Sequence, residues 1–377
     1  MAEPIARQVS VVGRDPEELA GALADRLGGP GLQLAFVFGD RRLDPAALAG
    51  VHRRLSAPVV GCSAWGVIGP DEPSSEPAVV GLGLYGDWVR IGIGVASELS
   101  KAALVRSHDA VHAAAAALGT TAAALDPARH VAITLIDGRY DHEEAFCIGS
   151  AAAAPRIRFV GGCASTDLDQ GERTCVWANG ELLNDAGVVI VLDSEHPFSA
   201  VTSAHLVPTE LRTVVTAASG RVIQELDGHP ATPRLRQLLA SIGDRLGERH
   251  PVHAFARYLD GVPYVRSLYR VDGDHLVLAC AVETGHVLRV MQPGDLVGTM
   301  RRDLATAATR VGGTMAAFLA FSCAGRHLEA AARGSANELA AAYAAYPAVG
   351  FRTMSEQSGM LLVNHTLTGL AIGAPKP

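Results

Sequence analysis

The feature that most constrains this chain is one order of local patterns that occurs three times along it. Each copy has an apolar strand, a helix, a second strand ending at a glycine, an irregular stretch and a third strand. The copies begin at Leu34–Phe38, Val131–Ile136 and Met315–Phe321. We interpret them as repeated β-α-β-x-β units, where x is the irregular stretch, in mixed sheets with flanking helices. Alternating helices and strands are common in α/β proteins, so an origin without repetition stays open.

The second copy is the clearest, and it is centred on the segment Arg158–Leu192. Its second strand runs into a turn made of Gly161, Gly162, Cys163, Ala164 and Ser165. Paired glycines allow a positive φ and a close approach to another chain or to a ligand. Further on, the step Asn179–Gly180 is a strong hairpin signal. Another tight hairpin is predicted at Gly86–Asp87, between the strand patterns of Ala78–Tyr85 and Trp88–Val95.

Length and composition place the chain in the mixed α+β class with two parts. A chain of 377 residues, 49% of them hydrophobic, can bury a sizeable core and is long enough for two or three domains or one large two-part domain. After about residue 208 the pattern changes to a run of antiparallel strand signals. We therefore predict an N-terminal part, residues 1–207, that holds two units. The C-terminal part, residues 208–377, holds these strands, a helix and the third unit.

The charge and the apolar pattern argue against two classes of partner. The formal net charge is −7 and no run of Lys or Arg forms a basic patch, so we expect no nucleic-acid partner. No apolar run approaches the roughly 20 residues that cross a bilayer, and no secretion signal is visible, so we expect no membrane association. None of the six cysteines forms a C-x-x-C pair, which gives no support to a cysteine-based zinc site. We predict a cytoplasmic protein, in which disulfides are rare.

Several motifs occur in an order that resembles FIST-domain proteins, with both the N-terminal and the C-terminal FIST parts. The matching segments are GCSAWGVIG (61–69), LIDGRYDHEEAF (135–146), VGGCASTDL (160–168), LVPTELRTVVTAA (206–218), AFSCAGR (320–326), GFRTMSEQ (350–357) and VNHTLTGLAIG (363–373). The resemblance covers nearly the whole chain from about residue 30. It implies a small-ligand receptor of bacterial signalling. Because the two parts leave no length for an output domain, we expect it to signal through another polypeptide.

The segments 206–218 and 366–373 are most similar to stand-alone FIST proteins that bind haem and sense nitric oxide. Those proteins act on a separately encoded histidine kinase or on cyclic-di-GMP enzymes, which the resemblance implies as partners here. The subgroup has a histidine two residues before the asparagine of the last motif. Here that position is Leu362, and His365 directly follows Asn364. Haem binding would need a substitute iron ligand such as His365, for which a purely structural role is the alternative.

Residues that follow strand ends are the first candidates for ligand binding. In α/β proteins, ligands bind beyond the carboxyl ends of strands, where loops offer free backbone N–H groups. The candidates at such ends are Cys62, Ser63, the turn residues Gly161, Gly162, Cys163 and Ser165, and then Ser322 and Cys323. If these ends converge, they form a polar pocket. Small residues that merely permit tight turns are the alternative.

Two arginines and three polar residues complete the candidate site. Arg173 and Arg326 are suited to hold a carboxylate or a propionate, because a guanidinium offers bidentate donors. Unremarkable surface positions are the alternative for both arginines. The last motif adds Glu356, Asn364 and Thr366 through the family pattern. An amino-acid-like ligand held by Arg173 or Arg326 therefore competes with haem as the ligand of the sensor.

An enzyme is the main alternative to a sensor. Cys62 or Cys163 at a glycine turn could act as a nucleophile, given a base such as His142. The chain has no G-x-S-x-G motif, no P-loop and no G-x-G-x-x-G between a strand and a helix. We therefore expect a ligand that is bound without turnover. A pure interaction protein is the remaining alternative.

Overall fold

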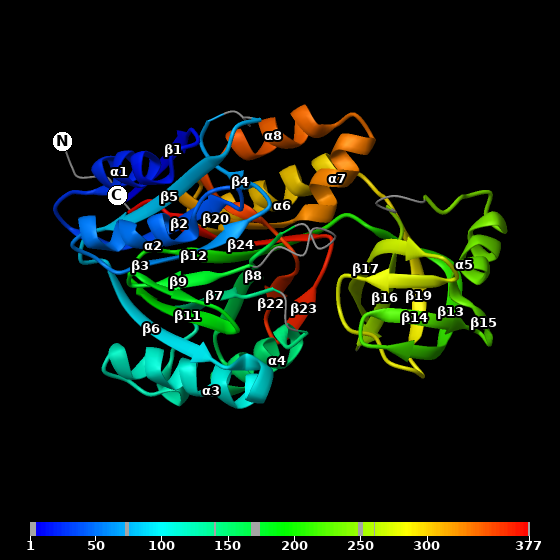
Figure 1. Cartoon of the computed structure of the whole chain (residues 1–377). Coiled ribbons are helices and arrows are strands. Elements are labelled where there is room, and N and C mark those ends of the chain that lie inside the picture. The colour runs from blue at the N-terminus through cyan, green and yellow to red at the C-terminus, as the bar shows by residue number, and fades with distance from the viewer. Residues whose placement is uncertain are drawn as a thin grey trace.

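The computed structural model describes residues 5–71, 75–138, 141–166, 174–247, 252–259 and 261–375. These residues form a larger body with three sheets and a smaller lobe with a fourth sheet, which stands at one end of the body (Figure 1). In this view, helices lie above and below the sheets of the body. The predicted mixed class, with repeated units and flanking helices, is confirmed.

The first unit begins with a strand and a capped helix and ends with a strand that lies in the sheet between its first two strands. Its elements are β1 (Ala6–Val12), α1 (Pro16–Leu27), β2 (Leu32–Asp40), α2 (Pro45–Ala49), the 3-10 helix η1 (Gly50–Arg54), β3 (Val59–Ala64), β4 (Val67–Ile68) and β5 (Ala78–Tyr85). Helix α1 starts where the Asp15 carboxylate accepts hydrogen bonds from the backbone N–H groups of Glu17 and Glu18. Proline at the first helical position fits because its missing N–H is not needed there.

The second and third units repeat this order with longer excursions. The second unit consists of β6 (Val89–Ser97), α3 (Leu99–Ala117), η2 (Ala122–Ala124), β7 (His130–Ile136), α4 (Glu143–Ala153), β8 (Arg158–Cys163), β9 (Val176–Ala178), β10 (Glu181–Leu183) and β11 (Ala186–Ser194). The third consists of β12 (Phe198–Ala204), α6 (Leu296–Arg310), β20 (Met315–Cys323), α7 (Ala324–Ala332), α8 (Ala336–Ala344), β21 (Ala348–Thr353), β22 (Glu356–Ser358), β23 (Leu361–Val363) and β24 (Thr366–Gly373).

The lobe is inserted into the third unit, between β12 and α6. Its elements are β13 (Val207–Ser219), β14 (Val222–Leu226), β15 (His229–Pro230), α5 (Ala231–Ala240), β16 (Ala254–Leu259), β17 (Val262–Asp272), β18 (His275–Leu278) and β19 (Val287–Gln292). Its strands make one sheet of seven, and every pairing described in it is antiparallel. We call residues 207–292 the inserted lobe.

All three units have the same strand arrangement. In each, the first two repeat strands are parallel, and the third is antiparallel to the first, as in β2, β3 and β5. The same holds for β7, β8 and β11 and for β20, β21 and β24. An additional strand pairs with the third one in every unit, namely β1, β6 and β12. The repeat predicted from the sequence is therefore a repeat of topology as well.

Each unit contributes a strand from its irregular stretch to the sheet of another unit, and this exchange is cyclic. Strand β9 follows β8 in the chain but pairs with β3 of the first unit. Strand β22 of the third unit pairs with β8 of the second, and β4 of the first unit pairs with β21 of the third. The three sheets also share one core, in which the rings of Phe38 and Phe351 lie 4.9 Å apart between centroids. This exchange and the common core join the units into one body.

Glycines at one position of each unit explain how closely the parallel strands approach. A Cβ on Gly61 would lie 1.7 Å from the carbonyl oxygen of Val37, its register partner. The corresponding distance is 2.2 Å for Gly161 and 1.7 Å for Gly350. The close approach predicted for the turn glycines is confirmed. The other expectation was wrong, because neither Gly161 nor Gly162 is among the residues with positive φ.

The two hairpin predictions had different outcomes. Asn179 and Gly180 both have positive φ, at 52° and 86°, and they connect the paired strands β9 and β10. The prediction of a hairpin at Gly86–Asp87 was wrong. The strands on either side, β5 and β6, belong to different sheets, because β6 pairs with β11 of the second unit. This turn is the passage from the first unit to the second.

The predicted boundary between residues 207 and 208 stays a prediction. In the structure, the inserted lobe begins at Val207, whereas the third unit packs in the shared core with the first two units. Within the described part of the chain, no helix combines the length and the apolar character needed to cross a membrane.

Candidate functional site

The carboxyl-terminal strand ends of all three units meet at one place. The backbone N–H of Ser165 donates to the carbonyl oxygen of Ser63, at 3.4 Å. The Ser165 hydroxyl donates to the carbonyl oxygen of Arg352 and accepts from the N–H of Trp65, at 2.9 Å. We call Ser63, Trp65, Ser165 and Arg352 the strand-end junction. The structure thus brings together two of the strand ends that the sequence singled out, at Ser63 and Ser165, and joins them to the end of β21 in the third unit.

The cysteines at these strand ends are poor nucleophiles. Cys62 and Cys163 are fully buried, and burial raises the pKa of both thiols well above the ordinary value. Cys323, at the end of β20, is in the same condition. Since the thiolate is the reactive form, these cysteines are suited to packing. The hydroxyl of Ser322, next to Cys323, forms a hydrogen bond of 3.1 Å with Nε2 of His327.

Arg326, in the first turn of α7, is the most unusual side chain near the junction. It is 0% exposed, and no carboxylate among the described residues forms an ion pair with it. Its Nη1 donates to the carbonyl oxygen of Ser203 at 3.3 Å and lies 3.4 Å from Nδ1 of His205. Its Nε and Nη2 have no hydrogen-bond partner in the described part of the chain. A buried charge without a counter-charge costs several kcal/mol, which makes this guanidinium a candidate for binding an anion.

Other cationic and polar groups surround Arg326 on the side of the junction. Burial raises the pKa of Tyr343, and the nearby charge of Arg326 acts in the opposite direction, yet the Tyr343 hydroxyl has no well-formed hydrogen bond. The ring of His327 stacks on that of Tyr343, with 6.1 Å between centroids. Burial lowers the pKa of His327 well below its ordinary value, and Arg352 and Arg326 add to the effect. The local field is therefore positive. Arg173, the other candidate arginine, lies outside the described residues.

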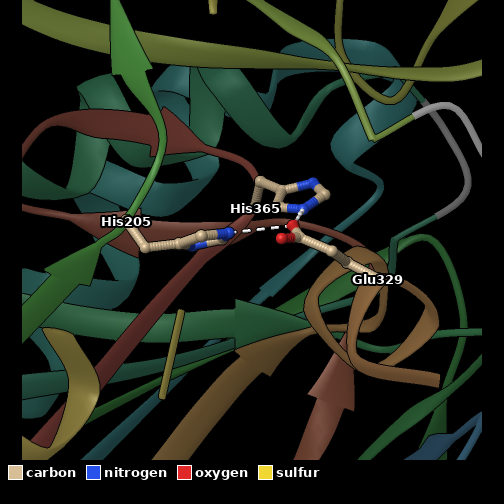
Figure 2. Close-up of side chains that lie close together, drawn as sticks. All are labelled: His205, Glu329 and His365. Carbon is tan, nitrogen blue, oxygen red and sulfur yellow. Dashed lines mark hydrogen bonds and ion pairs between the residues drawn. The ribbon is translucent and has the colours of Figure 1, made fainter. Parts of the chain in front are cut away.

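A second cluster, which Arg326 contacts through His205, joins two histidines to one glutamate (Figure 2). The Nε2 atoms of His205 and His365 both lie 2.8 Å from Oε2 of Glu329. His205 follows β12, Glu329 comes from α7, and His365 precedes β24. All three side chains are buried. We call these residues the His-Glu-His cluster.

Hydrogen bonding fixes the charge of this cluster. Burial alone would raise the pKa of Glu329, but the hydrogen bonds and charges of His205 and His365 outweigh it and hold the pKa well below its usual range. Burial lowers the pKa of His205. Because an arginine can only donate, Nδ1 of His205 accepts from Arg326, which assigns the proton of the ring to Nε2. The cluster is thus a carboxylate that accepts from the Nε2–H groups of two histidines.

His365 connects this cluster to the inserted lobe. Its Nδ1 lies 3.2 Å from the hydroxyl of Ser267 in β17. Both ring nitrogens are therefore engaged, and the residue is only 4% exposed. Ligation of a haem iron by His365 would therefore require one of these two contacts to break. Haem binding stays a prediction.

The three polar residues of the last motif support the turn before β24. Glu356 accepts from the N–H and the hydroxyl of Thr366, at 3.2 and 2.6 Å, and from the hydroxyl of Thr353. The amide nitrogen of Asn364 donates to the Ser355 hydroxyl at 2.9 Å. Its Oδ1 has no partner among the residues described. These bonds fix the turn that presents His365, which has a φ of 57°.

Glu356 provides a test of this arrangement. Burial raises its pKa to about 8, against hydrogen bonds from Thr353 and Thr366 that lower it. The folded chain therefore holds this proton more tightly than the unfolded chain. The stability it contributes is complete below the ordinary pKa of 4.5 and is lost as the pH rises through about 8.

We expect Glu356→Gln to remove that pH dependence. The free energy of unfolding of the unmodified chain should fall by up to about 1.4 kcal/mol per pH unit between these two values, and the variant should lose this slope. Denaturant unfolding at several pH values measures it. Glu181→Gln, at an exposed position of β10, is the control and should keep the slope. Equal slopes in all three proteins would contradict the assignment.

Sequence reasoning missed several residues of the site. Arg352 was within the motif GFRTMSEQ but was not singled out, and nothing near His205 or Glu329 in the sequence marks them. They become neighbours only because β12, α7 and β24 belong to the same unit. An alignment of the third repeat with the second would have drawn attention to His205 and His365. By strand register, His205 in the third unit is equivalent to Glu98 in the second, and His365 is equivalent to Asp185.

Fold and site together define a class: an α/β protein built from three repeated units, with buried polar groups where the strand ends converge. Residues 33–229 match the FIST N domain, and residues 231–359 match the FIST C domain. The chain therefore belongs to the FIST family, whose domains are signal-transduction sensor domains that bind small ligands.

Two curated proteins are similar over most of this chain. They are uncharacterized proteins of Mycobacterium bovis (strain ATCC BAA-935 / AF2122/97) and of Mycobacterium tuberculosis (strain CDC 1551 / Oshkosh). Each is 29% identical over 348 residues, which covers 86% of this chain and 83% of the relative. Among solved structures, cyanuric acid hydrolase from A. caulinodans aligns over 99% of this chain and 100% of its own, with 14% identity and a TM-score of 0.34.

Proposed function

We propose that this protein senses a small anionic ligand of the amino-acid or carboxylate type, with Arg326 as its counter-charge, and reports it to a separate signalling protein. The observation that carries the proposal is the fully buried guanidinium of Arg326. Among the residues that the structure describes, two of its nitrogens have no hydrogen-bond partner and no carboxylate forms an ion pair with it. A carboxylate would supply the missing charge and two acceptors in the geometry that a guanidinium prefers.

The contacts of Arg326 also suggest how binding could be reported. From Nη1 of Arg326, hydrogen bonds lead through His205, Glu329 and His365 to Ser267 of the inserted lobe. An anion that draws the guanidinium away from His205 breaks the first of these hydrogen bonds, between Arg326 and Nδ1 of His205. The seating of the lobe would then differ between the free and the bound state, as a sensor requires. A histidine kinase or a cyclic-di-GMP enzyme is the partner class that the resemblance suggests.

A thermal-shift screen of amino acids and small carboxylates tests the ligand. A ligand at about 100 times its Kd stabilises the native state by about 2.7 kcal/mol, so a binder should raise Tm clearly. Arg326→Gln should abolish the shift, whereas Arg310→Gln, in the last turn of α6, should keep it. Arg326→Lys, which keeps the charge but loses the fork of donors, covers the case in which the glutamine variant fails to fold. A shift of equal size in the Arg326 variants would overturn the proposal.

Haem-linked nitric oxide sensing is the second candidate, and it rests on the family resemblance of segments 206–218 and 366–373. An absorption spectrum with one equivalent of haem separates the two. A protein-type Soret band that responds to nitric oxide and weakens in His365→Ala would favour haem over a carboxylate. A spectrum like that of free haem would remove this candidate.

A further inference from the structure

We propose that His205, Glu329 and His365 form a binding site for one divalent transition-metal ion, of the class that includes Zn²⁺ and Fe²⁺. The proposal does not depend on the anion at Arg326, and the two can fail separately. It concerns a bare ion held by side chains alone, which is a different use of His365 from haem ligation.

The chemistry of the three groups fits such an ion. Two imidazole nitrogens and one carboxylate oxygen lie within 4.8 Å of one another, and each comes from a different element. Figure 2 shows both rings directed at the same oxygen of Glu329. Imidazole and carboxylate ligands suit Zn²⁺ and Fe²⁺, and sites with three protein ligands keep further positions for water.

The surroundings hold two of the ligands in place. The hydroxyl of Ser267 lies 3.2 Å from Nδ1 of His365. It can accept a hydrogen bond from the Nδ1–H group when Nε2 binds an ion. Nη1 of Arg333 donates to the other oxygen of Glu329 at 2.9 Å, which leaves Oε2 directed at the histidines. Such outer contacts orient ligands and are a regular part of metal sites.

A cavity lies beside the cluster. It has a volume of about 200 Å³, and Glu329, Arg333 and Glu338 are among the residues that line it. Glu329 therefore contacts the two histidines and also borders this cavity. Rotation of one carboxylate would connect the cavity to the cluster and admit an ion together with its water ligands.

Arg326 should weaken binding of the ion, and this effect distinguishes a metal site from a purely structural cluster. Its contact with Nδ1 of His205 keeps the ring proton on Nε2, the atom that an ion would need. Metal binding must move that proton to Nδ1 and must tolerate a nearby guanidinium charge. Arg326→Gln, which removes the charge, should therefore bind the ion more tightly than the unmodified chain. A merely structural cluster gives no reason for this gain.

The test is a titration of the full chain, made without a histidine tag and first treated with a chelator. Calorimetry with Zn²⁺ should give one equivalent, and Co²⁺ should give visible absorption bands of a nitrogen and oxygen site. His205→Ala and His365→Ala should each weaken binding by about 100-fold or more. His253→Ala is the matched control, since His253 is also buried and bonded to a carboxylate, that of Asp244, but belongs to no cluster of three within the described ranges.

Clear outcomes overturn the proposal. One is the absence of Zn²⁺ binding and of Co²⁺ bands in the unmodified chain, which needs no variant to fold. Another is binding that survives in both histidine variants, which would place the ion elsewhere. Weaker binding in Arg326→Gln would contradict the role given to that residue. Glu329→Gln, which keeps the size of the side chain, replaces the alanine variants if those do not fold and should also lose the ion.

Discussion

Replacing Glu329 with alanine is expected to lower the free energy of unfolding of the metal-free chain by about 3–5 kcal/mol. The variant removes the carboxylate that accepts from His205, His365 and Arg333, while those three side chains stay where they are. Two buried imidazole N–H groups and one guanidinium N–H then lose their acceptor. The cost of buried donors without partners is what makes this loss large.

Denaturant unfolding followed by circular dichroism measures the loss. Glu338→Ala is the control, since Glu338 lines the same cavity but is exposed on α8. It should change stability by no more than about 0.5 kcal/mol. Glu329→Gln retains an oxygen that can accept and should lie between the two. A loss in Glu329→Ala no larger than that of Glu338→Ala would show that the cluster contributes little to stability.

The second large effect is expected from Gly350→Ala in β21. The new Cβ would lie 1.7 Å from the carbonyl oxygen of Ala320, the register partner in β20. A backbone atom cannot turn aside as a side chain does, so the parallel pair must separate. Overpacking of a core commonly costs about 1–3 kcal/mol, and this contact with rigid backbone should exceed that range. We expect little or no folded protein.

The yield of folded protein and its melting curve measure this prediction. Gly13→Ala is the control, because its Cβ would meet only the flexible end of Leu19, at 3.2 Å. Gly61→Ala is a repetition of the test in the first unit, where the distance to Val37 is again 1.7 Å. Gly350→Ala protein with the yield and Tm of the control would contradict the close approach of the strands.

The second and third units differ at the positions where the third holds two residues of the His-Glu-His cluster. In the second unit, the two positions next to paired strands β6 and β11 are Glu98 and Asp185, which are near the start of α3 and bond to Lys101 and Ser100. In the third unit, the inserted lobe covers this edge, and the positions hold His205 and His365. His365 keeps the left-handed backbone of Asp185, with φ of 57° and 50°. The third unit therefore differs where the lobe is attached.

Sequence alone determined the features that depend on local patterns. Apolar periodicity showed three β-α-β-x-β units, because each strand and helix buries one face irrespective of its neighbours. Glycines at strand ends indicated close approach, and the Asn179–Gly180 step predicted a turn with two positive φ values. The order of motifs showed the FIST family. Each of these signals lies within a short stretch of chain, where the sequence can be read directly.

Only the tertiary structure decided how these pieces are combined. The circular exchange of β4, β9 and β22 and the separation of β5 from β6 depend on contacts between units, which no local pattern encodes. The His-Glu-His cluster joins positions 205, 329 and 365, which come together because the chain leaves the third unit for the lobe and returns. Arg326 looks like any arginine in the sequence. Its complete burial without a paired carboxylate in the described part of the chain, the basis of the proposed ligand site, is a property of packing alone.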